Sequence, residues 1–136
     1  MAVHNIVQTN SIYGVTYQVS PSNSGPTGSY LAPPMNPVPT NKVYKVNTVF
    51  VVNTSTTTDY EASVYHYISN NNGDHTVPYN AAGTGWIAQN VVVPAKSNIV
   101  MVSSDNPIYL QENDYLACYS NVVSTLQYTV SYEIIS

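Results

Sequence analysis

Alternation of apolar and polar side chains with a period of two residues most constrains the fold of this chain. The clearest case closes the sequence, where the apolar set is Leu126, Tyr128, Val130, Tyr132 and Ile134. Because successive side chains of a strand point to opposite faces, this segment predicts a strand with one buried and one solvated face. Helical periodicity is almost absent, so the sequence predicts an all-β protein.

Other strand-like segments follow one another at short spacing. They are Ile12–Val19, Lys42–Asn53, Tyr60–Ile68, Trp86–Val93, Ser97–Ser103, Pro107–Leu110 and Tyr115–Ser120, with a weaker one at Val3–Gln8. Polar stretches such as Asn53–Asp59 and Asn70–Asp74 separate them, as is typical of short antiparallel connections. Since no helix is available to cover a parallel sheet, we expect two packed antiparallel sheets, a jelly-roll-like β-sandwich.

The segment from residue 20 to residue 41 differs in composition from the rest of the chain. Residues 21–29 are turn-rich, and the prolines that follow favour an extended, polyproline-like backbone. These prolines are Pro33, Pro34, Pro37 and Pro39. A connection this long is uncommon in a compact domain unless it has a function or is disordered. We therefore expect residues 1–41 to form an N-terminal arm or hairpin that lies across a neighbouring subunit, and residues 42–136 to form the sandwich. The alternative, that residues 1–41 are a flexible linker packed on their own domain, is equally well supported by the sequence.

Charge is scarce and excludes some classes of partner. Charged residues make up 7% of the chain, there is no Arg, and the formal net charge is -4. Binding to a phosphate backbone depends on Lys and Arg contacts, so nucleic-acid binding is not expected. A polar but nearly uncharged surface has little self-repulsion, which favours homo-oligomers and other protein assemblies. No apolar run reaches the length of a membrane helix, and no signal-peptide pattern opens the chain, so we expect synthesis in the cytoplasm without membrane insertion.

Groups that could do chemistry are few and scattered. Cys118 lies in a strand-like run, where a thiol usually behaves as a small buried hydrophobe. His66 lies on the more apolar face of its strand and is expected to be a core histidine. The best oxygen ligands for calcium are in residues 112–114 and at Asp74, although ordinary turns explain both better. We expect no enzyme activity, no cofactor and no metal site.

Aromatic side chains offer a candidate contact surface. Tyr65 and Tyr67 share one face of a strand and could stack on a sugar or contribute to a protein interface, where Tyr is enriched. Packing against neighbouring strands is the favoured alternative for both. Trp86 is expected to be a core anchor rather than a binding platform. The candidate interface residues are therefore these two tyrosines and the four prolines named above.

Five short motifs stand out between residues 42 and 135, namely Val51–Ser55, Ala62–Tyr65, Val91–Ala95, Ile108–Asp114 and Tyr128–Ile135. They resemble motifs of small β-sandwich virion proteins of tailed bacteriophages, especially those of cyanobacteria. The stretch that resembles these proteins runs from Lys42 to Ile135, about two-thirds of the chain, and the N-terminal 41 residues have no counterpart. Asn113 stands where those proteins usually have a Gly between two acids, and Asn tolerates the left-handed backbone best after Gly. The resemblance implies a structural role in the head, neck or tail of a virus particle.

The sequence thus favours one function and leaves a second open. The first is a capsid decoration or cement subunit, which would bind capsid or other virion proteins and its own copies, with a trimer as one fitting assembly. Many copies in a particle can share the load through multivalency, even when each contact is weak. The second is a neck, tail or fibre-tip module that recognises a receptor or a glycan.

Overall fold

The computed structural model describes residues 11–21, 29–32, 38–67 and 84–136. These residues form strands and no helix. The strands are β1 (Ile12–Val19), β2 (Ser29–Ala32), β3 (Val43–Asn53), β4 (Tyr60–Tyr67), β5 (Thr84–Val93), β6 (Asn98–Val102), β7 (Ile108–Leu110), β8 (Tyr115–Ser120) and β9 (Leu126–Ile135). This part of the chain contains no helix long and apolar enough to cross a membrane.

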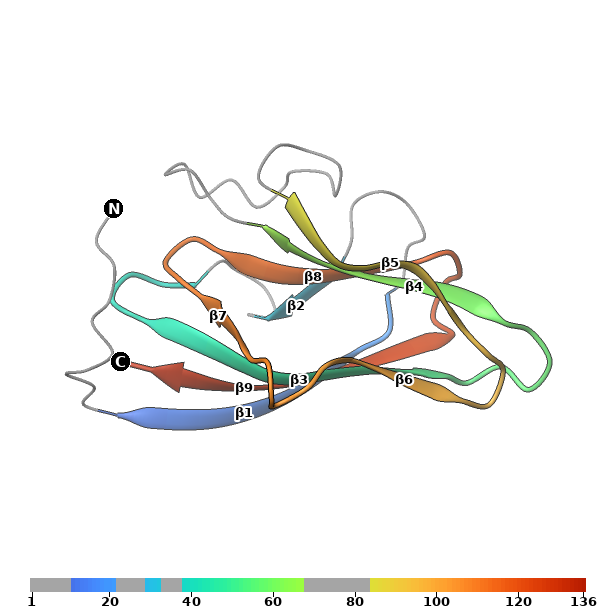
Figure 1. Cartoon of the computed structure of the whole chain (residues 1–136), viewed down its shortest axis with the longest axis horizontal. Helices are drawn as coiled ribbons and strands as arrows, with labels where there is room; N and C mark the ends of the chain where they lie inside the picture. The colour runs from blue at the N-terminus through green and yellow to red at the C-terminus, as the bar shows by residue number, and fades with distance from the viewer. Residues whose placement is uncertain (1–10, 22–28, 33–37, 68–83) are drawn as a thin grey trace.

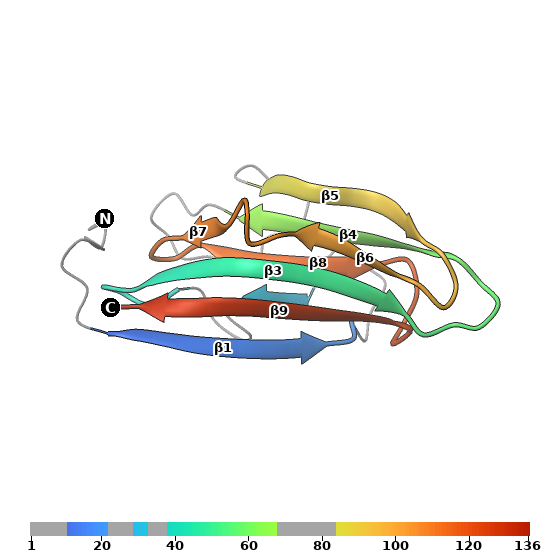
Figure 2. The same cartoon turned by 60° about the horizontal axis from the view of Figure 1, so that its bottom comes forward.

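The strands form two antiparallel sheets that pack face to face (Figure 1). The first sheet has the order β1-β9-β3-β6, and β7 pairs with β3 beside β6. The second sheet has the order β2-β8-β4-β5. Figure 2 shows β3 and β9 as long neighbouring strands in the middle of the first sheet. The expected antiparallel β-sandwich is confirmed.

The core lies between the sheets and is built by the alternating apolar residues. In β9, Leu126, Tyr128 and Val130 are fully buried, as the alternation predicts. From β3 come Val46, Val49 and Val51, all 0% exposed. Each fully buried Val or Leu side chain stabilises the folded state by about 1.5–3 kcal/mol relative to an exposed one. The period of two in β9, and in β3 on either side of the register shift between Val46 and Thr48, therefore fixes which faces meet.

Tyr128 ties the two sheets together with its hydroxyl group. It belongs to β9 in the first sheet, yet its Oη donates to the carbonyl oxygen of Tyr119 in the second sheet at 2.8 Å. The same Oη lies 2.9 Å from Ser120 Oγ and accepts the backbone N–H of Ser63 at 3.3 Å. Burial raises the pKa of this phenol well above its usual value. A buried hydroxyl with this many partners sets the alignment of one sheet on the other.

The described part of residues 1–41 differs from the expected arm. β1 pairs with β9 over its full length, and β2 pairs with β8. Val38 is 1% exposed in the core, its N–H donates to Asp114 O at 3.0 Å, and its carbonyl accepts Asn113 N–H at 2.9 Å. The sandwich therefore does not begin at residue 42, because strand pairing with distant residues draws these segments into both sheets. Residues 1–10, 22–28 and 33–37, and with them the weaker strand Val3–Gln8, lie outside the described part.

Candidate functional site

The second sheet carries aromatic side chains on the face turned away from the sandwich core. Strand alternation sends Val64 and Leu116 into the core and turns Tyr65 and Tyr115 to the opposite face. The outer cluster contains Tyr65, Tyr67, Tyr115 and Ala117, with Tyr30 and Trp86 packed against it. Four strands, β2, β4, β5 and β8, thus contribute to one outer aromatic cluster.

The rings of this outer aromatic cluster touch in pairs. Tyr67 stacks on Tyr115 with centroids 5.0 Å apart, and Tyr30 meets Tyr115 edge-on at 5.1 Å. Tyr65 meets Trp86 edge-on at 5.7 Å. Offset and edge-to-face arrangements at these distances contribute about 0.5–1.5 kcal/mol per pair beyond the burial of area. The cluster therefore stabilises the outer face of the sheet.

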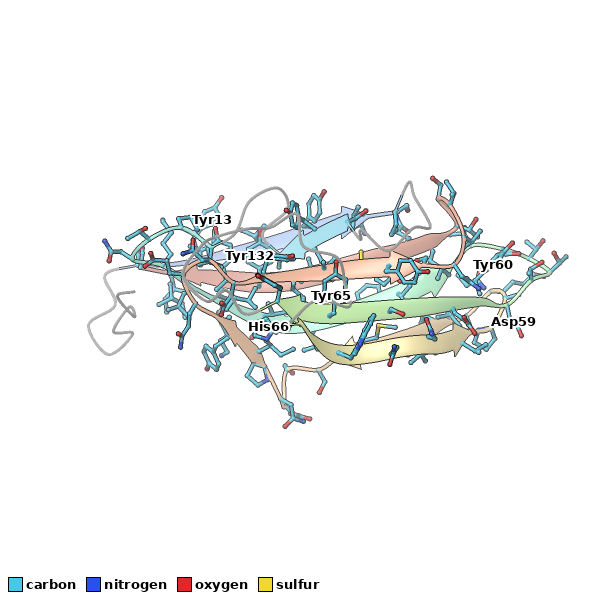
Figure 3. The ribbon with its side chains drawn as sticks, turned by 90° about the horizontal axis from the view of Figure 1, so that it is seen from above. Tyr13, Asp59, Tyr60, Tyr65, His66 and Tyr132 are labelled. Atoms are coloured by element: carbon cyan, nitrogen blue, oxygen red, sulfur yellow. The ribbon has the colours of Figure 1, made fainter. Side chains whose placement is uncertain are left out.

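Tyr65 and Tyr67 are only 2% and 6% exposed. This burial agrees with packing against neighbouring strands, which was the favoured alternative for both residues. Figure 3 shows Tyr65 on β4, next to His66. Trp86 differs from the expected core anchor, since it packs on the outer cluster rather than in the core between the sheets. Of the four candidate prolines, Pro39 is exposed, whereas Pro33, Pro34 and Pro37 lie outside the described residues.

One end of the sandwich is closed by the acidic turn at residues 111–114. Asn113 adopts a positive φ of 69°, the left-handed conformation that the sequence predicts for this position. Asp114 folds back on its own turn, since its Oδ2 accepts Gln111 N–H at 3.1 Å. Glu112 Oε1 accepts the hydroxyl of Thr40 at 3.3 Å. The turn is thereby fastened to the segment that precedes β3.

His66 lies beside this turn and differs from a fully satisfied core histidine. Its Nε2 stands 3.7 Å from Asp114 Oδ2, which is within ion-pair range but too far for a hydrogen bond. Among the described residues, His66 Nε2 and Glu112 Oε2 are buried and have no hydrogen-bond partner. The sequence gives no sign of this pairing, because β4 and the turn are brought together only by the fold. A positive charge on His66 would be attracted to the Asp114 carboxylate.

The opposite end of the sandwich is organised by a buried amide that the sequence did not single out. Asn53 is 1% exposed, and its Nδ2 donates to Val93 O at 2.8 Å and to Thr58 O at 2.9 Å. Its Oδ1 accepts Ser55 N–H at 2.9 Å. Nearby, Asp59 Oδ1 accepts Ala95 N–H at 2.9 Å, and Figure 3 shows Asp59 at this tip. Two of the resembling motifs, around residues 51–55 and 91–95, thus meet here.

Reactive groups do not gather in the part of the chain that the structure describes. Cys118 is 0% exposed, its Sγ contacts Ser29 O at 3.6 Å, and burial raises the pKa of the thiol, so it behaves as the expected buried hydrophobe. No cluster of three or more His, Cys, Asp or Glu side chains occurs in this part. Asp74, one of the two calcium candidates, lies outside it.

Comparison with known proteins gives one weak structural likeness. No protein-family model and no curated protein matches the chain. Among solved structures, it is similar to a chain in the crystal structure of the T13 IBDV viral particle, with a TM-score of 0.38 and 13% sequence identity. The match covers 92% of this chain and 30% of that chain, so the present chain spans less than a third of that chain's length. A likeness at this level assigns neither a family nor a function.

Proposed function

We propose that this chain is a structural subunit of a virus particle, used as a capsid decoration or cement protein, and that it has no catalytic activity. Its work would be contact between surfaces. The observation that carries this proposal is where exposed apolar side chains lie. Among the described residues, the large ones are Ile12, Tyr13, Val92, Val100, Tyr109 and Val123.

Five of these six residues lie on strands at the margins of the sheets. Ile12 and Tyr13 are in β1, Val92 is in β5, Val100 is in β6 and Tyr109 is in β7. β1, β5 and β6 end their sheets, and β7 continues the margin beside β6. Sheet margins are where further protein can add to a sandwich by strand pairing or edge packing. Apolar residues at several margins favour contacts with several neighbours, as a shell subunit needs.

The low charge of the surface supports the same proposal. With 7% charged residues and no Arg, copies of the chain can lie against each other without strong repulsion. In the central strands of the first sheet, Lys45 and Glu133 stand opposite each other at 3.8 Å, so two of the few charges offset each other. The specific proposal of a decoration or cement role comes from the resemblance of the sequence to tailed-phage virion proteins.

The alternative of a receptor- or glycan-binding tip gains no support from the tyrosines that suggested it. An aromatic sugar platform needs an open ring face, whereas Tyr65 and Tyr67 are almost fully buried. Neck or tail placement remains an alternative within the structural class.

Mass spectrometry of gradient-purified particles from the virus that encodes this sequence tests the proposal. We expect the chain in the particle at many copies, with loss of the chain lowering the temperature at which the particles release their genome. A chain absent from particles contradicts the virion role. A chain present at a few copies, at one vertex or on the tail, contradicts the decoration role and favours the neck or tail alternative.

A further inference from the structure

Within the described residues, the β1 margin of the first sheet differs from the other sheet margins in lacking the features that usually block strand addition. β1 runs for eight residues and keeps an unbroken register with β9. It contains no charged residue and no proline. Natural proteins usually protect such an edge by shortening it, charging it or bulging it.

The other margins carry such protection. β2 has four residues and a register shift between Tyr30 and Ala32. β6 has five residues, and its pairing with β3 shifts between Val49 and Phe50. β5 is long, but its pairing with β4 shifts twice, and Asn90 within it has a positive φ of 52°. β1 is therefore the margin best suited to regular pairing.

The hydrogen-bond pattern shows which backbone groups of β1 face outward. Ser11 and Ser136 exchange both backbone hydrogen bonds, at 3.0 and 3.1 Å, just before β1 begins. Hydrogen-bonded and non-bonded pairs alternate along an antiparallel ladder, so odd-numbered residues of β1 bond to β9. The N–H and C=O groups of the even-numbered residues then point away from β9. These residues are Ile12, Gly14, Thr16 and Gln18, and all are exposed.

We propose that β1 pairs antiparallel with β1 of a second copy of this chain, about a twofold axis at Val15. In this register Ile12 bonds to Gln18 of the partner copy, and Gly14 to Thr16. The two five-stranded sheets then become one continuous sheet. No like charges oppose each other, because the strand has none.

Side chains support this register as well as the backbone does. Val15 and Tyr17 pack toward the core, so Tyr13 shares their face by strand alternation. Tyr13 is nevertheless 67% exposed, and Figure 3 shows it at the margin of the molecule. Pairing about Val15 places Tyr13 opposite Tyr17 of the partner copy, in a non-hydrogen-bonded position where side chains lie closest. An aromatic cross-strand pair would cover the exposed ring.

The inference deepens the proposed assembly role and rests on it for its biological meaning, but it is tested on the isolated protein. Sedimentation equilibrium over a concentration series should show a species of twice the chain mass. Thr16→Pro removes an outward N–H without removing a bond to β9, so it should give a folded monomer with an unchanged far-ultraviolet spectrum. A chain that stays monomeric, a trimer, or a Thr16→Pro variant that still dimerises overturns the proposal.

Disulfide trapping tests the register itself. Two Val15 residues at the axis have Cα atoms about 4.5 Å apart in a non-bonded pair, which suits a disulfide. Val15→Cys should therefore yield mostly covalent dimer on mild oxidation. Two copies of Gln18 lie about 20 Å apart in this register, so Gln18→Cys is the matched control and should stay monomeric on a non-reducing gel. The buried Cys118 should not cross-link in the unaltered chain. Equal cross-linking of both variants, or none by Val15→Cys, overturns the register, whereas the virion role is decided separately by the composition of particles.

Discussion

The two ends of the sandwich solve the same problem of closing the sheets in different ways (Figure 1). At the Asn53 end, buried polar groups of Asn53 and Tyr128 make hydrogen bonds to several segments at once. At the acidic-turn end, Asp114 bonds within its own turn and Glu112 bonds to Thr40, while His66 Nε2 and Glu112 Oε2 have no hydrogen-bond partner among the described residues. A substitution at Asn53 or Tyr128 would leave buried backbone groups without a hydrogen-bond partner, which costs more free energy than the loss of one hydrogen bond alone. The Asn53 end should therefore be the more sensitive to substitution.

Asn53→Leu should have the largest effect. The side chain keeps its size but loses three hydrogen bonds, which leaves the buried carbonyl of Val93 without the Nδ2 donor. We expect a loss of about 2–4 kcal/mol in the free energy of unfolding, measured by urea denaturation. Asn98→Ala is the control, because Asn98 is exposed, and it should change stability by less than about 0.5 kcal/mol. Equal effects of the two variants would contradict the role of Asn53.

Tyr128→Phe should have the second-largest effect on stability. It removes only the hydroxyl that joins β9 to Ser63, Tyr119 and Ser120. The expected loss is about 1–2 kcal/mol, seen as a lower urea midpoint with an unchanged slope. Tyr109→Phe, at a 46% exposed position, should be nearly neutral. If both variants unfold alike, the hydroxyl does not tie the sheets together.

Alkaline pH should weaken the acidic-turn end through Tyr132. This ring stacks on Tyr44 at 5.2 Å, and burial raises the pKa of Tyr132 to about 12. In the unfolded chain a tyrosine loses its proton near pH 10, so above that pH the folded state holds the proton that the unfolded state has lost. The contribution of Tyr132 to stability should therefore be constant below about pH 10 and fall as the pH rises from 10 toward 12.

Urea unfolding at several pH values checks this slope in the Tyr128→Phe background, because the raised pKa of Tyr128 acts in the same direction. The raised pKa values of Cys118 and Tyr44 do so too, and they are common to both variants of the comparison. Adding Tyr132→Phe should make the alkaline fall shallower. An unchanged slope would show that Tyr132 does not titrate differently in the two states.

Asn113 should show the smallest effects. Its positive φ suits Gly as well as Asn, so Asn113→Gly should shift the free energy of unfolding by less than about 0.5 kcal/mol. Asn113→Ala should cost about 1 kcal/mol, because a Cβ without a local hydrogen-bonding group disfavours the left-handed region. Thermal melting of the pair checks this order, and a more stable Ala variant would contradict it.

Local sequence patterns were sufficient to predict β1, β3, β4, β8 and β9 with nearly the right ends, since apolar strand-like runs bounded by polar turns can be recognised without knowing the partner strand. These patterns did not predict β2 (Ser29–Ala32), which follows a turn-rich stretch and forms a strand only by pairing with β8. The acidic turn was predictable because its backbone conformation is local. The partner of His66 was not, since no local rule links a strand residue to a distant turn.

By itself, the sequence determined that this chain is all-β, that it buries the alternating faces of its strands, and that its surface carries little charge. These properties depend on neighbouring residues and on composition, so they can be read without coordinates. Only the tertiary structure decided which strands stand at the margins, that β1 belongs to the sandwich rather than to an arm, and that Asn53 and Tyr128 join distant segments. Those features depend on contacts between residues far apart in the chain, and these contacts form only when the two sheets pack together.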